Sequence, residues 1–344
     1  MTKFLSLTKS ISVRKDTNFF KIPILLYTCK PLMPKNPLKR IKVVGKYIFN
    51  CVKSHRYEKE LPVNGDIAIS IGEKNFKVIR LKEKVIYTIY SNTKADHKKM
   101  LQILKSKNSS KLYEGILNVD RKKGIIKGVY YNGHHPNLLK RNTLTDEMIN
   151  ELFISLIISS SIKEVNLKEY VNFLVTNCRR ILRRDAHKIE EQESKFVIGV
   201  IEELSQKIIN ALPLDKIKLT LSHGDLKQDN LIEVKNKLIP IDWEFCDFRS
   251  PSFDIYKFQS RFPKYGKEFY EKVFLNLGKV RKVSNSEHKD YFQQTVKVYL
   301  DLFLLEDVYL RLKQYESRSF AANFSTHLIK AIIRNQNELK RVNS

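Results

Sequence analysis

The sequence predicts an α+β protein in which a small, antiparallel, β-rich lobe precedes a larger, mainly helical lobe. Three observations indicate this architecture. Short apolar strands separated by tight turns occupy residues 66–90 and 112–131. Helical periodicity dominates from about residue 145 to 212 and again from about residue 251. Between the helical regions, residues 219–241 read as a short strand, a polar loop and a hairpin.

Residues 1–60 are the first predicted segment, a basic N-terminal extension. Residues 1–35 contain scattered prolines and are expected to be irregular. Over residues 36–56 apolar side chains recur at helical spacing among Lys and Arg, which predicts a basic amphipathic helix. Such a helix lies on an anionic membrane surface or packs on its own domain, and the sequence is compatible with both interpretations.

Residues 61–133 are the second predicted segment, the small β-rich lobe, and residues 134–344 are the third, the helical lobe. A meander of three strands, one helix and two more strands is expected in the small lobe. These elements are predicted at Asp66–Ile71, Phe76–Leu81, Val85–Tyr90, Ala95–Lys107, Leu112–Val119 and Gly124–Tyr131. In the third segment, the hairpin strands are expected at Leu231–Val234 and Leu238–Ile241, and a long amphipathic helix from His288 to Tyr315.

The composition excludes several classes of protein. Hydrophobic residues make up 42% of the 344 positions, which is enough to build a packed core and argues against a disordered chain. No apolar run reaches 18 residues, so no transmembrane helix is expected, and no secretory signal is recognised. The four cysteines are far apart, which predicts free thiols in a reducing cytoplasm instead of a zinc site or a disulfide framework.

The formal net charge is +26, and most of the excess lies in the first 133 residues. A cation of this size attracts nucleic acid, anionic lipid or acidic glycan and disfavours a cationic substrate. A solvated lysine-rich surface would give the same count, so the charge alone does not select a function. No zinc finger or aromatic RNA-binding run accompanies the charge, and no specific nucleic-acid partner is expected.

The polar loop His223–Asn230 carries the groups suited to chemistry. Asp225 lies five residues before Asn230, and Asp242 follows the second strand of the hairpin. Phosphoryl transfer needs a divalent metal to bridge phosphate oxygens, and Mg²⁺ prefers carboxylate and amide oxygens. Asn230 and Asp242 supply such oxygens, while Asp225 is placed to orient and deprotonate an attacking hydroxyl. The sequence therefore predicts a phosphotransferase site in this region.

The loop and the Ile241-Asp242-Trp243-Glu244 run resemble the aminoglycoside phosphotransferase and choline kinase family, relatives of the protein kinases. The resemblance is specific from about Leu219 to Tyr256. It implies a protein-kinase-like two-lobed fold, with Asp225 as the catalytic base and Asn230 and Asp242 as the metal ligands. It also implies a structural role for His223, which would buttress the loop, and for Asp254, which would accept backbone hydrogen bonds from it.

The predicted small lobe departs from this family pattern. The family places a lysine on the third strand, where this chain has Thr88, and the predicted helix that follows contains no glutamate. Either Lys84 or another nearby lysine takes its place, or the lysine–glutamate pair of the family is absent. The turn at Gly72 is expected to cover the nucleotide phosphates, and backbone groups around Val129 and Tyr131 are expected to meet the base.

The prediction from the sequence is a cytoplasmic kinase that uses ATP and Mg²⁺. It would transfer the γ-phosphoryl group to a hydroxyl of a small molecule or a glycan. The acceptor is expected to be neutral or anionic because the chain is strongly basic. Peripheral contact with the anionic inner face of a membrane is part of this hypothesis. Two alternatives stay open: a catalytically inactive kinase-fold binding module, and a binder of anionic polymers such as nucleic acid.

Overall fold

The structure is a computed structural model whose residues group into two compact units. The first unit comprises Met1–Asn137 and Gln228–Glu244, and the second comprises Leu138–Lys227 and Phe245–Ser344. The structure describes residues 1–8, 10–33, 36–53, 58–71, 75–90, 101, 103, 115–138, 143–158, 162–184, 189–210, 216–262, 287–317 and 324–343.

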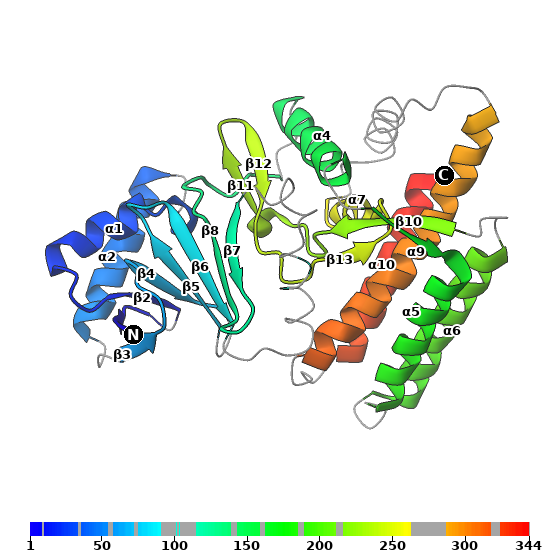
Figure 1. The fold of residues 1–344 in the computed structure, drawn as a ribbon, viewed down its shortest axis with the longest axis horizontal. Helices are drawn as coiled ribbons and strands as arrows, with labels where there is room; N and C mark the ends of the chain where they lie inside the picture. The colour runs from blue at the N-terminus through cyan, green and yellow to red at the C-terminus, as the bar shows by residue number, and fades with distance from the viewer. Residues whose placement is uncertain are drawn as a thin grey trace. The chain divides into compact units, whose positions relative to one another are not determined.

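In its described residues, the first unit is built on an eight-stranded sheet (Figure 1). Every neighbouring pair of strands is antiparallel. In the order of the sheet the strands are β3 (Glu58–Leu61), β1 (Thr2–Ser6), β2 (Ile11–Arg14), β4 (Ile67–Ser70), β5 (Asn75–Arg80), β6 (Val85–Tyr90), β8 (Ile125–Val129) and β7 (Ile116–Asp120). The predicted meander and the two later strands of the small lobe are therefore confirmed, with ends that differ by a few residues. The predicted helix over Ala95–Lys107 lies outside the described residues, apart from positions 101 and 103.

The expectation that residues 1–35 are irregular is wrong. Strands β1 and β2 pair with each other, β1 also pairs with β3, and β2 pairs with β4, so this region extends the sheet. Helix α1 (Ile22–Thr28) follows, with Pro23 in its first turn, where a missing N–H costs least. The strands were missed because each is short and carries charged residues. Lys15 pairs with Glu58 across the sheet, an arrangement that the sequence alone does not display.

Helices α1 and α2 (Pro37–Lys53) pack on one face of the sheet. The alternation of side chains along the strands explains this. Ile67 and Ile79 point to the face that α1 and α2 cover, whereas Ala68 and Val78 belong to a second core cluster. The predicted amphipathic helix at residues 36–56 is therefore present, and part of it packs on its own domain.

The hairpin of β11 (Leu231–Val234) and β12 (Lys237–Pro240) belongs to the first unit. It is tied to the segment that follows β8. His134 forms a β-bridge with Glu233, and the His135 ring Nδ1 lies 3.0 Å from the Leu231 carbonyl oxygen. Gly133 lets the two segments approach closely, because a Cβ at this position would lie only 2.3 Å from the Glu233 carbonyl oxygen.

The second unit is mainly helical. Its three-stranded sheet contains β13 (Asp247–Arg249), β10 (Lys216–Ser222) and β9 (Ile162–Asn166). The sequence predicted only helix over the stretch that contains β9. Its described helices are α4 (Thr143–Ile158), α5 (Leu167–Arg184), α6 (Glu191–Asn210), α7 (Phe253–Gln259), α9 (Glu287–Ser317) and α10 (Phe324–Asn343).

The core of the second unit forms where α5, α6 and α7 pack against α9. Phe253 and Phe303 meet edge to face, with ring centroids 5.4 Å apart, and both are fully buried. Cys178 and Cys246 are buried in this unit and Cys29 in the first, and none of the three forms a disulfide. In the described part of the chain, no helix has both the length and the apolar character needed to cross a bilayer.

Candidate functional site

The loop after β10 is held by one buried carboxylate. Asp254, in the first turn of α7, accepts hydrogen bonds from the backbone N–H of His223 at 2.6 Å and of Gly224 at 2.9 Å. It also accepts one from the Ser222 hydroxyl at 3.1 Å. Backbone donors that point into a buried site must find partners, and a carboxylate satisfies several at once. The predicted role of Asp254 as the anchor of this loop is confirmed.

His223 and Gly224 shape the backbone that leads to Asp225. His223 is fully buried, and its Nδ1 accepts a hydrogen bond from the Asp225 N–H at 3.3 Å, as expected for a residue that buttresses the loop. Gly224 has a φ of +83°, and a Cβ on it would lie 2.4 Å from the Phe245 carbonyl oxygen. Only glycine fits this position without displacing the backbone of Phe245.

Asp225 lies in an electropositive setting. The Arg261 Nη2 is 2.6 Å from its Oδ1, and the Lys227 Nζ is 2.9 Å from its Oδ2. Burial opposes ionisation of the carboxyl, but Arg261 and then Lys227 outweigh burial, and the pKa of Asp225 falls below its ordinary value. Arg261 also donates to the Leu226 carbonyl, which fixes its guanidinium against the loop. Asp225 is therefore ionised at neutral pH and held in one orientation.

A second buried carboxylate supports the segment that precedes α7. Glu306 of α9 accepts hydrogen bonds from the Ser250 N–H at 2.8 Å, the Ser250 hydroxyl at 2.6 Å and the Tyr170 hydroxyl at 2.8 Å. Burial raises the pKa of Glu306 to about 7, although these three donors oppose the shift. The segment between β13 and α7 is thus fastened to α9.

Asn230 and Asp242 lie at the same end of the β11–β12 hairpin in the first unit. Leu231 pairs with Pro240, and the Ile241 N–H donates to the Asn230 carbonyl at 2.9 Å. This register places Asp242 one residue beyond the partner of Asn230. Asp242 has a φ of +68°, the left-handed region that few residues other than glycine occupy and in which Asp and Asn are enriched. Left-handed backbone conformations at residues other than glycine are enriched at functional sites.

Lys77 of β5 pairs with Asp242. Its Nζ lies 3.0 Å from Oδ2 of the carboxylate, and both side chains are largely shielded from solvent. The register of the sheet puts Lys77 directly opposite Thr88 of β6. Residues opposite each other in an antiparallel pair share one face, with Cβ atoms about 5 Å apart. A lysine is therefore present next to Thr88, on the neighbouring strand.

The four residues predicted to contact the nucleotide lie in different parts of the first unit. Gly72 lies outside the described residues. Lys84 is an exposed residue with a φ of +53° in the turn between β5 and β6, and its carbonyl accepts from the Tyr130 N–H. Val129 ends β8, where its N–H donates to the Gly115 carbonyl at 2.6 Å, and Tyr131 follows two residues later. The N–H of Val129 is thus already used within the sheet.

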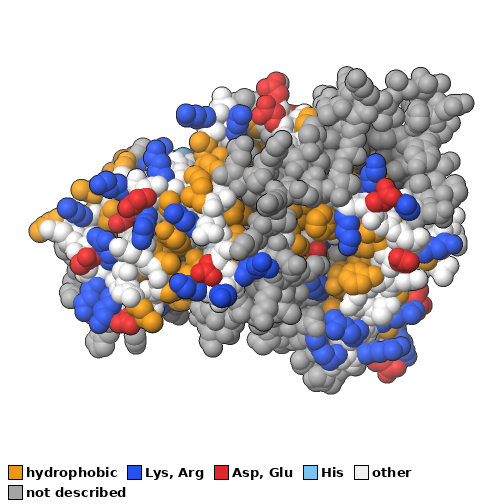
Figure 2. Space-filling model, viewed as in Figure 1, with side chains coloured by type: hydrophobic (Ala, Val, Ile, Leu, Met, Phe, Trp, Pro, Cys, Tyr) orange, Lys and Arg blue, Asp and Glu red, His pale blue; other side chains and the backbone are white. Residues whose placement is uncertain are grey.

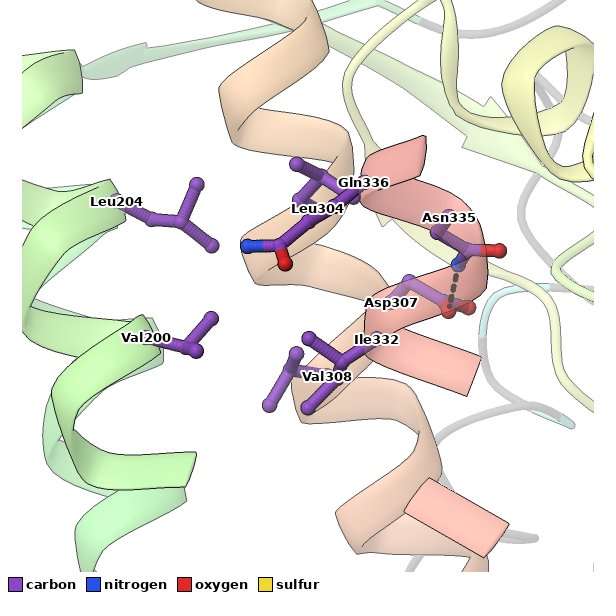
Figure 3. A pocket seen from close by; sticks show the side chains of 8 residues that line it. All are labelled: Val200, Leu204, Leu304, Asp307, Val308, Ile332, Asn335 and Gln336. Atoms are coloured by element: carbon purple, nitrogen blue, oxygen red, sulfur yellow. Dashed lines mark hydrogen bonds between the residues drawn. The ribbon is translucent and has the colours of Figure 1, made fainter. Parts of the chain in front are cut away.

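A separate pocket lies among α6, α9 and α10 of the second unit (Figure 3). Its wall is mostly aliphatic, with Val200 and Leu204 facing Val308 across it. The Asn335 amide donates to Asp307 at 2.8 Å at its edge. Asp307 also pairs with Lys257 of α7 and Arg311 of α9, so the polar groups beside the pocket belong to a buried structural network. None of the predicted site residues lines this pocket.

Sequence reasoning missed Lys77, Lys227 and Arg261. Lys227 follows Asp225 by two residues, so its proximity could have been inferred from the loop itself. Lys77 could be found only from the pairing of β5 with β6, since the strand that carries it was predicted but its register was not. Arg261 lies two residues beyond the end of α7 and 36 residues after Asp225, and no spacing rule indicates it.

The sequence matches no protein-family model and no curated protein. The structure, in contrast, is similar to a choline kinase from Cryptosporidium parvum, with a TM-score of 0.55 and 14% identity over 80% of this chain and 88% of that chain. It is also similar to a choline/ethanolamine kinase family protein from Mesorhizobium loti, with a TM-score of 0.53 and 14% identity over 78% and 86% of the two chains.

A third similar structure is the GDP complex of wild-type aminoglycoside 2'-phosphotransferase-IIIa, with a TM-score of 0.51 and 10% identity over 79% of this chain and 92% of that chain. The chain has a kinase-like fold. The predicted fold class, a two-lobed α+β architecture of this kind, is thereby confirmed. At these identities the similarity establishes the fold, and the activity has to be argued from the residues.

Proposed function

We propose that the protein is a phosphotransferase that moves the γ-phosphoryl group of ATP onto an alcohol group of its acceptor. The observation that carries the proposal is the loop of Asp225, fixed by Asp254 in a chain with a kinase-like fold. A carboxylate held ionised at the end of a rigid loop suits the alignment of a hydroxyl nucleophile. In this proposal Asp225 acts on the acceptor hydroxyl, and Asn230 and Asp242 hold the metal of the nucleotide.

Asn230 and Asp242 would hold Mg²⁺. Their side chains offer an amide oxygen and a carboxylate oxygen, the hard ligands that Mg²⁺ prefers, and the hairpin register keeps the two residues at one end. The ammonium of Lys77 already lies against Asp242, so the surroundings of this carboxylate accommodate a positive charge. When bound, Mg²⁺ would neutralise charge on the phosphates of ATP.

Lys77 is proposed to bind the nucleotide phosphates in place of the lysine that is absent at position 88. An ammonium beside a metal-binding carboxylate is within reach of the phosphate oxygens that the same metal would hold. Its contact with Asp242 favours Lys77 over Lys84, which lies in the turn at the far end of β5. The turn at Gly72 and the backbone near Val129 and Tyr131 stay proposed contacts for the phosphates and the base.

Asp225 is proposed to orient the acceptor hydroxyl and to take its proton as transfer proceeds. A carboxylate with a lowered pKa is a weak base, which suits a reaction in which the proton leaves late. Lys227 lies against the same carboxylate and is more exposed than Asp225, so its ammonium is placed to meet the transferring phosphoryl group. Arg261 would keep the carboxylate in its orientation.

The acceptor is proposed to be a neutral or anionic small molecule or glycan. Choline and aminoglycosides, after which the similar kinases are named, are cations, so this part of the proposal rests on the charge of the chain and not on those names. A net charge of +26 disfavours cationic acceptors unless an acidic pocket opposes the overall field. Because the donor would be cytoplasmic ATP, we place the reaction in the cytoplasm, and at the inner face of the membrane where the acceptor is lipid-linked.

A catalytically inactive binding module is the second candidate function. It is favoured by the same contacts that hold Asp225, because both carboxylate oxygens are occupied by cations from Arg261 and Lys227. In an active enzyme, the acceptor hydroxyl has to share or displace one of these contacts. In a binding module no acceptor hydroxyl approaches Asp225, so both contacts can stay in place.

The test is a screen of hydroxyl acceptors with labelled ATP and Mg²⁺, with Asp242→Ala as the blank and Asp225→Asn as the catalytic variant. We expect label transfer by the wild type and a loss of about 10²- to 10⁴-fold in Asp225→Asn, with Mg·ATP binding retained. Mg·ATP binding without transfer to any acceptor would favour the binding module. Failure of the wild type to bind Mg·ATP in calorimetry, together with salt-sensitive binding of DNA or RNA, would favour the anionic-polymer binder.

A further inference from the structure

Helices α1 and α2 expose large apolar side chains. On α2, Leu38, Ile41 and Phe49 are exposed, and Phe20 and Ile24 are exposed just before and within α1. Leu38 is 76% exposed and Phe20 is 82% exposed, values far above what a residue at the edge of a core retains. Clustered exposure of this kind, unlike a single surface leucine, marks an interaction surface.

The exposed residues of α2 form a stripe of their own. Positions 38, 41, 45 and 49 repeat at helical spacing and fall on one side of the helix. Gly45, within this stripe, has nothing within 4 Å of where a Cβ would stand. The core contacts of the helix come from other positions, because Val44 is buried and Tyr47 packs against the same core cluster. The helix therefore carries more apolar surface than the fold uses.

Positive charge surrounds this stripe. Lys39, Lys42 and Lys46 are exposed on α2, and Arg40 stacks on the ring of Tyr27 from α1, with its guanidinium carbon 4.9 Å from the ring centroid. Residues 17–57 contain nine Lys or Arg residues and no Asp or Glu. In Figure 2, hydrophobic and basic side chains lie next to one another, with a few acidic ones among them, over the end of the first unit where Figure 1 labels α1 and α2.

We propose that this surface binds an anionic lipid bilayer. The α1–α2 surface is defined as Phe20, Ile24, Leu38, Ile41 and Phe49 together with the lysines at positions 39, 42 and 46. The apolar side chains would enter the boundary between headgroups and acyl chains, while the lysines meet lipid phosphates. The inference concerns membrane binding alone and does not depend on the phosphotransfer reaction.

Other occupants fit this surface less well. A second copy of the chain would bring two positively charged surfaces together, which like-charge repulsion opposes. A nucleic acid would neutralise the lysines, but its phosphate backbone would leave Leu38, Ile41 and Phe49 in water. An anionic bilayer satisfies both the charge and the apolar side chains.

Deletion of the N-terminal region is not a clean test, because residues 1–61 contribute β1, β2 and β3 to the sheet. Exposed side chains can instead be replaced without disturbing the core. The test variant is Leu38→Glu combined with Ile41→Glu. Its matched controls are Ile333→Glu on α10 and Phe196→Glu on α6, which are also exposed apolar residues on helices.

The experiment measures sedimentation of the full chain with vesicles of phosphatidylcholine, with or without about one third phosphatidylglycerol. We expect the wild type to bind the anionic vesicles only, and the Leu38→Glu/Ile41→Glu variant to bind on the order of tenfold more weakly or worse. The control variants should bind as the wild type does. Circular dichroism of each variant checks that the fold is retained.

The contribution of the α2 lysines is tested with the double variant Lys42→Glu/Lys46→Glu. Its control is Lys168→Glu/Lys195→Glu, which changes the net charge by the same amount at positions on α5 and α6. Loss of binding only in the first pair supports the α1–α2 surface. Equal loss in both pairs means that overall charge attracts the vesicles, and it would overturn the proposal. Unchanged vesicle binding by the α2 variants also overturns it, as does a wild-type dimer in sedimentation velocity that only those variants dissociate.

Discussion

The ammonium of Lys77 lies 3.0 Å from the carboxylate of Asp242, and the sheet places Lys77 directly opposite Thr88. Kinase-like sequences carry their phosphate-binding lysine on the third strand of the small lobe, where this chain has threonine. The geometry supplies a lysine to the same face from the adjacent strand. In the proposed function, Lys77 takes the role of the lysine that is absent at position 88.

Replacement of Lys77 by Met is expected to weaken Mg·ATP binding by about 10- to 100-fold, because a charge-assisted contact to phosphate is lost. Lys84→Met is the matched control and should bind nucleotide as the wild type does. Because positions 77 and 88 share one face, Lys77→Met/Thr88→Lys should recover a large part of the affinity. Calorimetric titration with Mg·ATP measures all four proteins. Wild-type affinity in Lys77→Met would show that Lys77 serves only to hold Asp242.

Arg261 sets the ionisation of Asp225. Removal of its guanidinium in Arg261→Met takes away the largest of the interactions that lower the pKa of this carboxyl, while burial continues to raise it. The pKa of Asp225 should therefore rise. In the proposed reaction Asp225 acts as a carboxylate, so the acid limb of kcat/KM against pH should move to higher pH. Arg261→Lys keeps a positive charge and should shift the limb less. A limb that stays in place would assign it to another group.

The residues of the candidate loop could be predicted from the sequence because short-range spacing fixes them. Asp225, Asn230 and the hairpin between Asn230 and Asp242 follow from turn signals and apolar runs a few residues long. The anchoring role of Asp254 also followed from its segment and is confirmed by the hydrogen bonds that it accepts from the loop. Local sequence carries this information because the loop, the hairpin and the start of α7 are close along the chain.

Contacts that depend on strand register or on distant helices could not be predicted. Lys77 contacts Asp242 through a sheet whose pairing is set by packing of both faces, and Arg261 reaches Asp225 from the end of another element. β1 and β2 were missed for a related reason. Their pairing with each other and with β3 and β4 stabilises them, and short charged segments do not display that pairing. At these positions the pairing of strands in the folded chain, and not the intrinsic strand propensity of the residues, decides the local structure.

The substitution Gly224→Ala tests the geometry of the loop that carries Asp225. A Cβ in Gly224→Ala would lie 2.4 Å from the Phe245 carbonyl oxygen, at a backbone φ of +83°. We expect the variant to lose at least about 2 kcal/mol in the free energy of unfolding and to displace the Asp225 carboxylate. Gly199→Ala in α6 is the control, since nothing lies within 4 Å of its Cβ position, and it should gain up to about 1 kcal/mol. Urea unfolding compares the two, and equal stability of both variants would contradict the geometry.

Glu306 should make stability depend on pH. Its pKa is raised to about 7 in the folded protein from an ordinary value of 4.5, chiefly by burial. The folded state therefore binds a proton more tightly than the unfolded state does. The stabilisation this provides is complete below pH 4.5 and is lost as the pH rises through about 7. Glu306→Gln stays neutral throughout. Its free energy of unfolding, relative to the wild type, should increase by on the order of 3 kcal/mol between pH 4.5 and 8.

Tyr170→Phe provides the control for Glu306, because its hydroxyl is one of the donors that hold the ionised form. Without that hydrogen bond the pKa of Glu306 should rise further, and the loss of stability should move to higher pH. Urea unfolding of the wild type and both variants across this range measures the effect, and the pH dependence of other groups cancels in the differences. A Glu306→Gln difference that stays constant with pH would mean that Glu306 is ionised in the fold, held by Ser250 and Tyr170 strongly enough to offset its burial.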